Sequence, residues 1–270
     1  MTKKDLARLK RLFLKYVQAN RMEDPSEQRN IALKRRHTLS VCRDMGFLCR
    51  GEGLNENDSL IARAAALLHD IGRFRQYSDF RTFDDRTSVN HGLLGAEILA
   101  KENFFPDGLD RGERALILQA VKYHNAYAIP RLDRRTVFFI KLVRDADKLD
   151  IWKVMLEFFA QPEEHRATAA GLGLPEGRGV SLEIIPVVLE NRVVPISLVK
   201  SLNDYKLLLL SWVFSINFKT TFRLFLRRRY AKALEASLPP GEEVRKAVVH
   251  IEDFARSCTF ANGPQKEKRT

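Results

Sequence analysis

The sequence is poor in cysteine, and its three cysteines, Cys42, Cys49 and Cys258, form no Cys-X-X-Cys pair. An odd number of cysteines without that spacing argues against a disulfide framework and against a thiolate metal site, and it favours a reducing compartment. Glycine and proline are also scarce, with 14 and 10 residues among 270. The chain is 45% hydrophobic and 30% charged, which is typical of a globular protein with one large core or a core and an appendage.

Long apolar runs are absent, because no uncharged stretch reaches the ~18 residues that a membrane-spanning helix needs. The segment LLLLSWVFSINF at 207–218 is too short for a bilayer, and we expect it to be a buried helix. The first residues, MTKKDLARLKRLFLKYV, are charged throughout and offer no small-residue cleavage site, which argues against a secretory signal. We therefore expect a cytoplasmic protein that does not associate with membranes.

The hydrophobic periodicity predicts an all-α protein. Helices are expected at 3–20, 26–49, 59–69, 90–103, 110–124, 134–160, 199–235 and 241–256, and residues 72–88 read as irregular. Residues 180–197 are β-branched and interrupted by proline, which leaves a short β-hairpin open as an alternative there. The expected organisation is an N-terminal helix over 1–25, a helical core over 26–160 and a helical extension over 161–270 packed on that core.

The formal net charge is +12, with basic residues spread along the chain rather than gathered in a tail. A positive surface is compatible with nucleic-acid binding, with attraction of a small anionic substrate, or with a solvated face that has no ligand. The charge alone does not distinguish these three interpretations.

Ionisable side chains recur on the apolar faces of the predicted helices. Spacings of three or four residues from apolar neighbours put each of them on an inward face or at a helix end. The set comprises His37, His69, Asp70, His91, His124 and Asp147. A single buried histidine is usually bonded to a carbonyl, but several imidazoles and carboxylates together are costly to bury unless they are paired or bound to metal. A divalent metal would satisfy all of them at once.

The ordered set His37, His69-Asp70 and Asp147, within the local sequences HDIGRF and RDADKLD, resembles the defining motif of the HD-domain metal-dependent phosphohydrolase superfamily. The resemblance covers roughly residues 30–155. His91 and His124 resemble the two additional histidines of HD proteins with a two-metal site, which include cyclic-dinucleotide phosphodiesterases and a diadenosine-tetraphosphate hydrolase family. The segment YHNAYAIP departs from the former, which have a second adjacent histidine and a Gly-Tyr-Pro segment there. A cyclic di-GMP substrate is therefore not expected.

The resemblance implies one or two bound divalent cations, with iron, manganese or another transition metal as the expected ion. Asp70 would bridge two ions, and the full implied ligand set is His37, His69, Asp70, His91, His124 and Asp147. A metal-activated hydroxide would then attack the phosphorus of a small phosphoester.

Asp70 and Arg73 are the predicted catalytic residues, and Arg73, Arg86 and Lys148 are the predicted phosphate-binding residues, since a guanidinium matches two phosphate oxygens. Arg81 is a further candidate in the same segment. Ordinary surface arginines remain the alternative for Arg81 and Arg86.

The leading hypothesis is an HD-type phosphohydrolase, a phosphomonoesterase or a phosphodiesterase, that acts on a nucleotide or a related small phosphorylated molecule. One alternative is a non-catalytic nucleotide-binding sensor on an HD scaffold. Another is a single-metal 5′-nucleotidase-type phosphatase. A nucleic-acid binder that uses the positive charge is the least favoured, and a homodimer is left open.

Overall fold

The computed structural model describes residues 1–102 and 104–260, and over these residues it contains helices and no β-strand. The predicted all-α fold class is confirmed. Contacts divide the chain into two compact units, Met1–Pro175 and Glu176–Thr270. Within the described residues, no helix combines the length and the apolar character that crossing a membrane requires.

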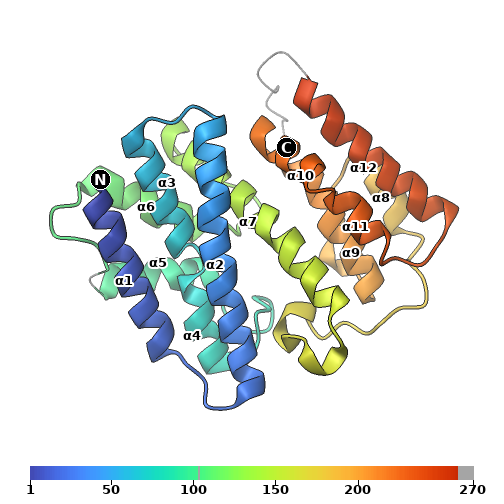
Figure 1. The fold of residues 1–270 in the computed structure, drawn as a ribbon, viewed down its shortest axis with the longest axis horizontal. Helices are drawn as coiled ribbons and strands as arrows, with labels where there is room; N and C mark the ends of the chain where they lie inside the picture. Colours follow the sequence, from blue (N-terminus) through green and yellow to red (C-terminus); the bar gives the residue numbers. More distant parts are fainter. Residues whose placement is uncertain (103, 261–270) are drawn as a thin grey trace. The chain divides into compact units, whose positions relative to one another are not determined.

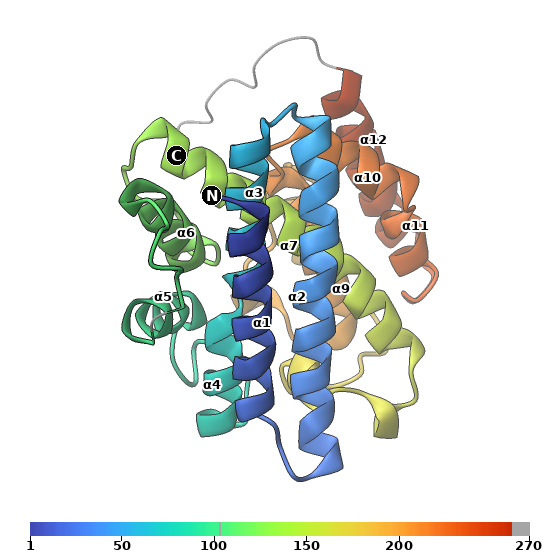
Figure 2. The ribbon, with the colours of Figure 1, turned by 60° about the vertical axis from the view of Figure 1, so that its left-hand side comes forward.

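The first unit contains seven α-helices and two short 3-10 helices among its described residues (Figure 1). Their bounds are α1 (Lys3–Ala19), α2 (Pro25–Gly51), α3 (Glu56–Leu68), α4 (Ile71–Phe80), α5 (His91–Lys101), α6 (Arg111–Tyr123), α7 (Arg134–Ala160), η1 (Glu163–His165) and η2 (Thr168–Gly171). The long helix α2 packs against α3 and α7, and α6 packs against α3, α5 and α7. Figure 2 shows α1 running antiparallel beside α2. The inner faces of α2, α3, α6 and α7 therefore enclose a common interior.

Side-chain caps set where the two longest helices begin. The carboxylate of Asp24 accepts hydrogen bonds from the backbone N–H groups of Ser26 and Glu27, and Pro25 occupies the first position of α2, where no N–H is needed. Asp133 caps α7 in the same way. The predicted helices at 26–49 and 134–160 are confirmed. Helix α3 is capped by Asn55 and begins at Glu56, three residues before the expected start at 59.

The prediction of an irregular segment over 72–88 is wrong for its first part, where α4 forms. Ile71, Phe74 and Tyr77 follow one another at steps of three residues and are buried, while the residues between them are mostly polar. The helix ends at Phe80, and Arg81, which follows it, has a left-handed backbone with φ 57°. The rest of the segment is irregular, as expected.

The second unit is built mostly from short helices, with one longer helix, α12, at its end. Their bounds are α8 (Ile184–Leu189), η3 (Ile196–Leu198), α9 (Leu202–Ser211), η4 (Trp212–Ser215), α10 (Lys219–Arg227), α11 (Tyr230–Glu235) and α12 (Glu242–Phe260). Helix α12 packs against α8, α9, α10 and α11. The expected continuous helix over 199–235 is in fact broken into α9, η4, α10 and α11, and only the first part of 207–218 is α-helical.

The alternative of a β-hairpin at 180–197 is wrong, because α8 and η3 occupy this segment. Ile184 and Val188 are buried one helical turn apart, and Ile185 is buried beside them. Pro186 lies in the first turn, where its missing N–H removes no helical hydrogen bond. β-Branched composition therefore misled the prediction, since burial on one face decided the conformation.

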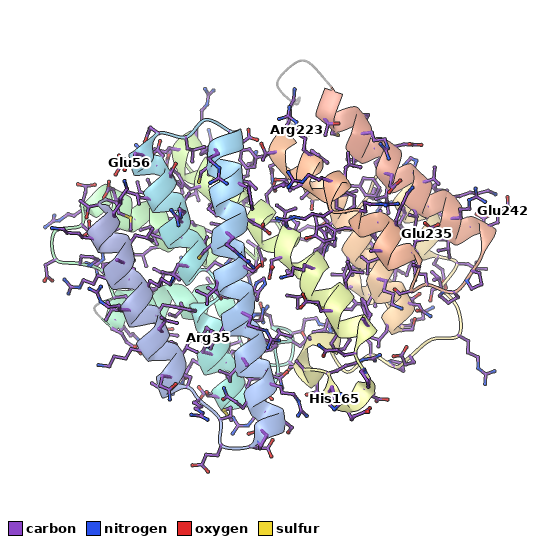
Figure 3. The ribbon with its side chains drawn as sticks, in the orientation of Figure 1. Arg35, Glu56, His165, Arg223, Glu235 and Glu242 are labelled. Atoms are coloured by element: carbon purple, nitrogen blue, oxygen red, sulfur yellow. The ribbon has the colours of Figure 1, made fainter. Side chains whose placement is uncertain are left out.

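Charged side chains cover the surface of both units. Arg35, Glu56 and Arg223 are exposed, and Figure 3 shows their side chains projecting away from the ribbon. His165 is also exposed, which agrees with its exclusion from the set of inward-facing histidines.

Candidate metal centre

The six predicted ligands come together inside the first unit, although they belong to separate helical segments. Their positions are the middle of α2 (His37), the junction of α3 and α4 (His69 and Asp70), the first residue of α5 (His91), the residue after α6 (His124) and the middle of α7 (Asp147). The five ligands other than Asp147 are at most 4% exposed, and the side chain of Asp147 is 18% exposed. The cluster is thus nearly closed, with Asp147 on its open side.

Asp70 lies at the middle of the cluster. Its Oδ2 atom is 3.5 Å from Nε2 of His37 and 3.6 Å from Nε2 of His69. Its Oδ1 atom is 3.4 Å from Nε2 of His91 and 3.8 Å from Nε2 of His124. The two carboxylate oxygens therefore face two different pairs of histidines. A carboxylate in this position can be shared by two neighbouring cations, which lie about 3.5–4 Å apart in two-metal sites.

Asp147 belongs to the first of these pairs. Its Oδ1 atom is 3.0 Å from Nε2 of His37 and 3.4 Å from Nε2 of His69. Each of these two imidazole nitrogens therefore lies within 3.6 Å of one carboxylate oxygen of Asp70 and one of Asp147. Asp147 also lies close enough to His69 and His124 for the three to share a cation. Imidazole and carboxylate donors without a thiolate suit divalent transition metals.

Each of the four imidazoles is held from the outside through Nδ1. The partners are the carbonyl oxygens of Ala66 and Val121 for His69 and His124, and the carboxylates of Asp150 and Asp85 for His37 and His91. The Nδ1 atoms donate in all four hydrogen bonds, at 2.7–2.8 Å, because carbonyl and carboxylate oxygens only accept. In its neutral form each ring therefore presents the lone pair of Nε2 to the interior, as histidines that ligate a metal do.

The inward-facing atoms lack partners of their own. Among the residues that the structure describes, Nε2 of His37, Nε2 of His69 and Oδ1 of Asp147 are buried and form no hydrogen bond. A buried polar atom without a partner costs about 1–3 kcal/mol, so three in one place are unfavourable unless a cation is bound there. The residues present therefore fit a metal ion.

The second pair of histidines leads to the same conclusion. Nε2 of His91 and Nε2 of His124 are 2.9 Å apart, and both rings already use Nδ1 as the donor. Two lone pairs facing each other at this distance repel. Two nitrogens that bind one cation at about 2.1 Å and at a right angle would lie about 3.0 Å apart, which matches the observed separation.

The pKa values indicate which of the clustered side chains are already in the protonation state that binds a cation. Burial opposes ionisation of Asp70 and Asp147, but Lys34 beside Asp70 and the histidines beside both residues hold their pKa values well below the ordinary range. Burial and Arg73 lower the pKa of His91 to about 3. Both carboxylates are therefore ionised and His91 is neutral at pH 7.

His37 differs, because burial and Lys34 lower its pKa while Asp147 and Asp150 raise it more, to about 9. Metal-free protein should therefore hold a proton on His37 at pH 7.5 that a bound cation displaces. The stability that this proton adds to the metal-free fold is complete below the unfolded pKa of about 6.5 and is lost as the pH rises through about 9.

Calorimetric titration with Mn²⁺ at pH 7.5 in buffers of different ionisation enthalpy measures the proton release. We expect about one proton per chain from His37. A His165→Ala variant, which alters an exposed histidine outside the cluster, should release the same number. Metal binding without proton release would contradict the assigned state of His37.

Lys34 is a residue of the site that the sequence analysis missed. Its Nζ atom donates to Oδ2 of Asp70 at 2.8 Å, and its side chain is 13% exposed. It also lies 5.3 Å from the centre of the Phe83 ring. Lys34 precedes His37 by one helical turn, and that spacing is the only signal in the sequence that indicates its place beside the ligands.

Arg73 contacts the cluster mainly through Asp85. Its Nη1 atom donates to Oδ1 of Asp85 and to Oε1 of Gln76, each at 2.8 Å, while its Nε atom is 3.6 Å from Oδ1 of Asp70. Asp85 in turn accepts the hydrogen bond from Nδ1 of His91. Arg73 therefore holds the carboxylate that orients His91. Asp85 was not singled out in the sequence, because its segment shows no periodicity.

The other predicted phosphate-binding residues lie in different surroundings. Arg86 pairs with Asp84 and is 57% exposed. Arg81 directly follows α4 and pairs with Glu27. Lys148 is buried, its Nζ atom has no hydrogen-bond partner among the described residues, and burial together with Arg144 lowers its pKa to about 8.

Two glycines allow the helices of the site to approach closely. A Cβ atom on Gly72 would lie 2.2 Å from the carbonyl oxygen of His91 and 2.8 Å from the backbone nitrogen of Gly95. A Cβ atom on Gly92 would lie 2.4 Å from Oδ1 of Asn125. The first contact brings α5 against the start of α4, and so brings His91 to Asp70. The second brings α5 against the end of α6.

The family model of the HD domain matches residues 35–152, a segment that includes all six clustered residues. No curated protein matches the chain, and no solved structure matches it either. The match and the geometry agree, since the histidines and aspartates that the structure brings together fit a metal site of the HD type. Residues 35–152 of this chain therefore match the HD domain, and the clustered histidines and aspartates within them fit a metal site of that type.

Proposed function

We propose that the protein hydrolyses a phosphoester of a nucleotide or a related small phosphorylated molecule at a centre that holds two divalent cations. The HD domain supports metal-dependent phosphohydrolase activity in general. The observation that carries the proposal is the cluster of buried Nε2 and carboxylate oxygen atoms that face one another in the interior. The four histidine rings of this cluster are all held from outside by hydrogen bonds of Nδ1.

His37, His69 and Asp147 would hold one cation and His91 and His124 the other, with Asp70 shared between them. Bound divalent cations lower the pKa of water and offset negative charge on phosphoryl oxygens. Iron or manganese is the ion that we propose first, and cysteine usage supports a cytoplasmic place of action.

Lys34 is the cation best placed to meet a substrate phosphate. Its ammonium lies beside Asp70, and Lys34 and Asp147 are the partly exposed members of this side of the cluster. A phosphoryl group that enters here can accept a hydrogen bond from Lys34. We propose that Arg73 positions Asp85, and through it His91, because its guanidinium already donates hydrogen bonds to Asp85 and Gln76.

The two alternatives differ from this proposal in definite ways. A single-metal 5′-nucleotidase-type phosphatase leaves the close approach of His91 and His124 without an explanation. A nucleotide-binding sensor would retain both cations and bind nucleotide without releasing product. The paired histidines favour the two-cation enzyme over the first alternative, and turnover separates it from the second.

Hydrolysis tests the proposal directly. We expect full-length protein loaded with Mn²⁺ or Fe²⁺ to release phosphate or a nucleoside monophosphate from at least one member of a panel of nucleotides, phosphodiesters and dinucleoside polyphosphates. The double variant His69→Ala/Asp70→Ala should lose the activity, and Arg86→Ala, which removes an exposed side chain outside the cluster, should show whether that predicted phosphate contact matters. Complete inactivity of metal-loaded protein across the panel would reject the enzyme and leave the sensor.

A further inference from the structure

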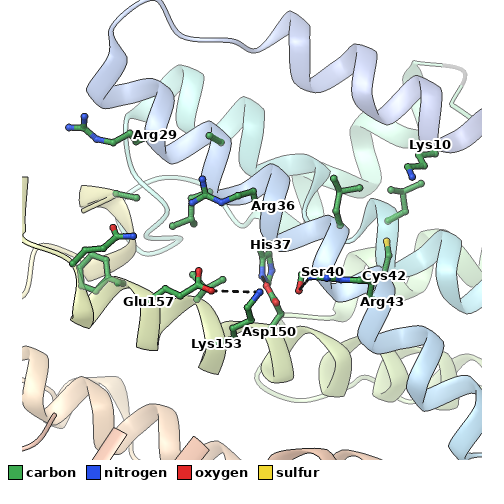
Figure 4. A pocket seen from close by; sticks show the side chains of 18 of the residues that line it. Lys10, Arg29, Arg36, His37, Ser40, Cys42, Arg43, Asp150, Lys153 and Glu157 are labelled. Atoms are coloured by element: carbon green, nitrogen blue, oxygen red, sulfur yellow. Dashed lines mark hydrogen bonds and ion pairs between the residues drawn. The ribbon is translucent and has the colours of Figure 1, made fainter. Parts of the chain in front are cut away.

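A groove separate from the metal centre lies in the first unit, on the side of His37 that faces away from Asp70. This groove of about 780 Å³ runs between α2 and α7, with α1 and α3 contributing to its wall (Figure 4). His37 is the only one of the six clustered ligands that lines it, and none of Lys34, Arg73 and Lys148 does. The groove is therefore separate from the phosphate-binding side of the metal centre.

The lining of the groove is strongly basic. Six basic side chains line it against two acidic ones, Asp150 and Glu157. The basic residues are Lys10, Arg29, Arg36, Arg43, Arg63 and Lys153. Figure 4 shows those of α2 along one wall and Lys153 with Glu157 on α7 opposite. The groove thus carries a local excess of positive charge close to a low-dielectric interior, which attracts anions.

Most of this charge is not neutralised by the protein. Lys153 pairs with Glu157 at 3.6 Å, but among the described residues no carboxylate lies within ion-pair distance of Lys10, Arg36 or Arg63. Arg43 donates to the hydroxyl of Ser40, and Arg29 to a backbone carbonyl. These guanidinium and ammonium groups remain available to a ligand.

The arginines of α2 form a regular row. Arg29, Arg36 and Arg43 follow one another at intervals of seven residues, which is two helical turns, so they lie on one face of α2 about 10 Å apart. Guanidinium groups bind phosphate oxygens in pairs. A row of this kind suits a ligand with several phosphate groups or one phosphate chain.

Besides its basic residues, the groove has apolar side chains, which form its floor, and a buried carboxylate. Leucine, valine and phenylalanine side chains line it, among them Leu33, Leu39, Val154 and Phe158. Asp150 is fully buried, and while its Oδ2 atom accepts from His37, its Oδ1 atom has no hydrogen-bond partner among the described residues. An acceptor in this position needs a hydroxyl or an N–H group from the ligand.

We propose that this groove binds a nucleoside polyphosphate: the phosphates on the arginines of α2, the base against the apolar floor, and a sugar hydroxyl or ring N–H on Oδ1 of Asp150. The volume is that of a pocket for a small ligand. Because Asp150 also orients His37, an occupant of the groove touches the partner of a metal-centre histidine. The proposal goes beyond the proposed function and does not depend on hydrolysis.

Calorimetry on the full-length, metal-free protein in EDTA tests the site with ATP, GTP and inorganic tripolyphosphate as probes. We expect one nucleoside triphosphate per chain, bound at least about 10-fold more tightly than tripolyphosphate, because the latter offers neither a base nor a donor. The variant Arg36→Glu/Arg43→Glu should weaken nucleotide binding at least about 30-fold, since two charge-assisted contacts are reversed.

The matched control is Arg11→Glu/Lys15→Glu, which changes the net charge equally on an exposed face of α1 outside the groove. It should bind nucleotide as the unmodified protein does, and both variants should unfold at the same temperature. Equal loss in both variants, or no saturable binding, would overturn the proposal. Tighter binding of a single-stranded oligonucleotide than of any nucleotide would replace the small ligand by a nucleic acid. Since no metal is present, failure here leaves the proposed hydrolysis untouched.

Discussion

Replacing Asp70 by asparagine should remove both cations at once. The amide keeps the shape of the carboxylate but loses its charge, and each carboxylate oxygen faces a different pair of histidines. We expect both affinities to fall by more than the roughly 10–100-fold that follows the loss of an outer partner of a metal ligand. Elemental analysis after dialysis should find two metal ions per chain in the unmodified protein and none in Asp70→Asn.

Two further variants make this measurement decisive. His91→Ala removes a ligand of one position only, so it should keep one ion per chain. Asp84→Asn removes a carboxylate that pairs with Arg86 outside the cluster, and it should keep both. Retention of two ions by Asp70→Asn would exclude a shared carboxylate. A single ion in the unmodified protein would favour the single-metal phosphatase.

Replacing Gly72 by alanine should destabilise the first unit by about 3 kcal/mol, although only one methyl group is added. The new Cβ atom would lie 2.2 Å from the carbonyl oxygen of His91 and close to the backbone of Gly95, and neither can move without shifting α5. Denaturant unfolding of metal-free protein measures the loss. The same shift moves His91 away from Asp70, so the second cation should bind more weakly in whatever protein remains folded.

Gly46→Ala is the matched control for this substitution. Gly46 lies inside α2, and a Cβ atom there would meet only the end of the Arg50 side chain at 3.7 Å. Alanine in a helix is about 0.5–1 kcal/mol more favourable than glycine, so this variant should be more stable than the unmodified protein. Equal effects of the two substitutions would show that α4 and α5 do not pack as closely as described.

The six clustered residues were accessible to sequence reasoning because burial and helical periodicity act locally. His37 and Asp147 stand among apolar residues at helical spacing, and a polar residue on such a face is conspicuous in one dimension. The residues that anchor these ligands were accessible only in part. Asp150 shares the apolar face of α7 with Val143 and Ala146, so the same helical spacing marks it, although its contact with His37 is tertiary. Asp85 reaches His91 from an irregular segment in which no pattern marks it.

The helices also divide into those that a pattern in the sequence marks clearly and those that tertiary packing decides. The helices at 26–49 and 134–160 have long apolar stripes and clear caps, and their prediction was confirmed. Helix α4 has only Ile71, Phe74 and Tyr77 to mark its buried face, too few to stand out among charged neighbours. In the second unit, α8 is helical because its apolar face is buried in the packed structure, which overrides the β-branched composition that favoured a hairpin.

The ion pair between Lys34 and Asp70 affects whether the protein needs its metal in order to fold. Small zinc-binding domains do not fold until their ion arrives, because nothing else compensates their ligands. Here an ammonium 2.8 Å from the central carboxylate supplies positive charge from within the chain. We therefore expect the polypeptide to fold without its ions and to take them up afterwards. Relative abundance and affinity at the time of loading, rather than events during synthesis, would then select the element.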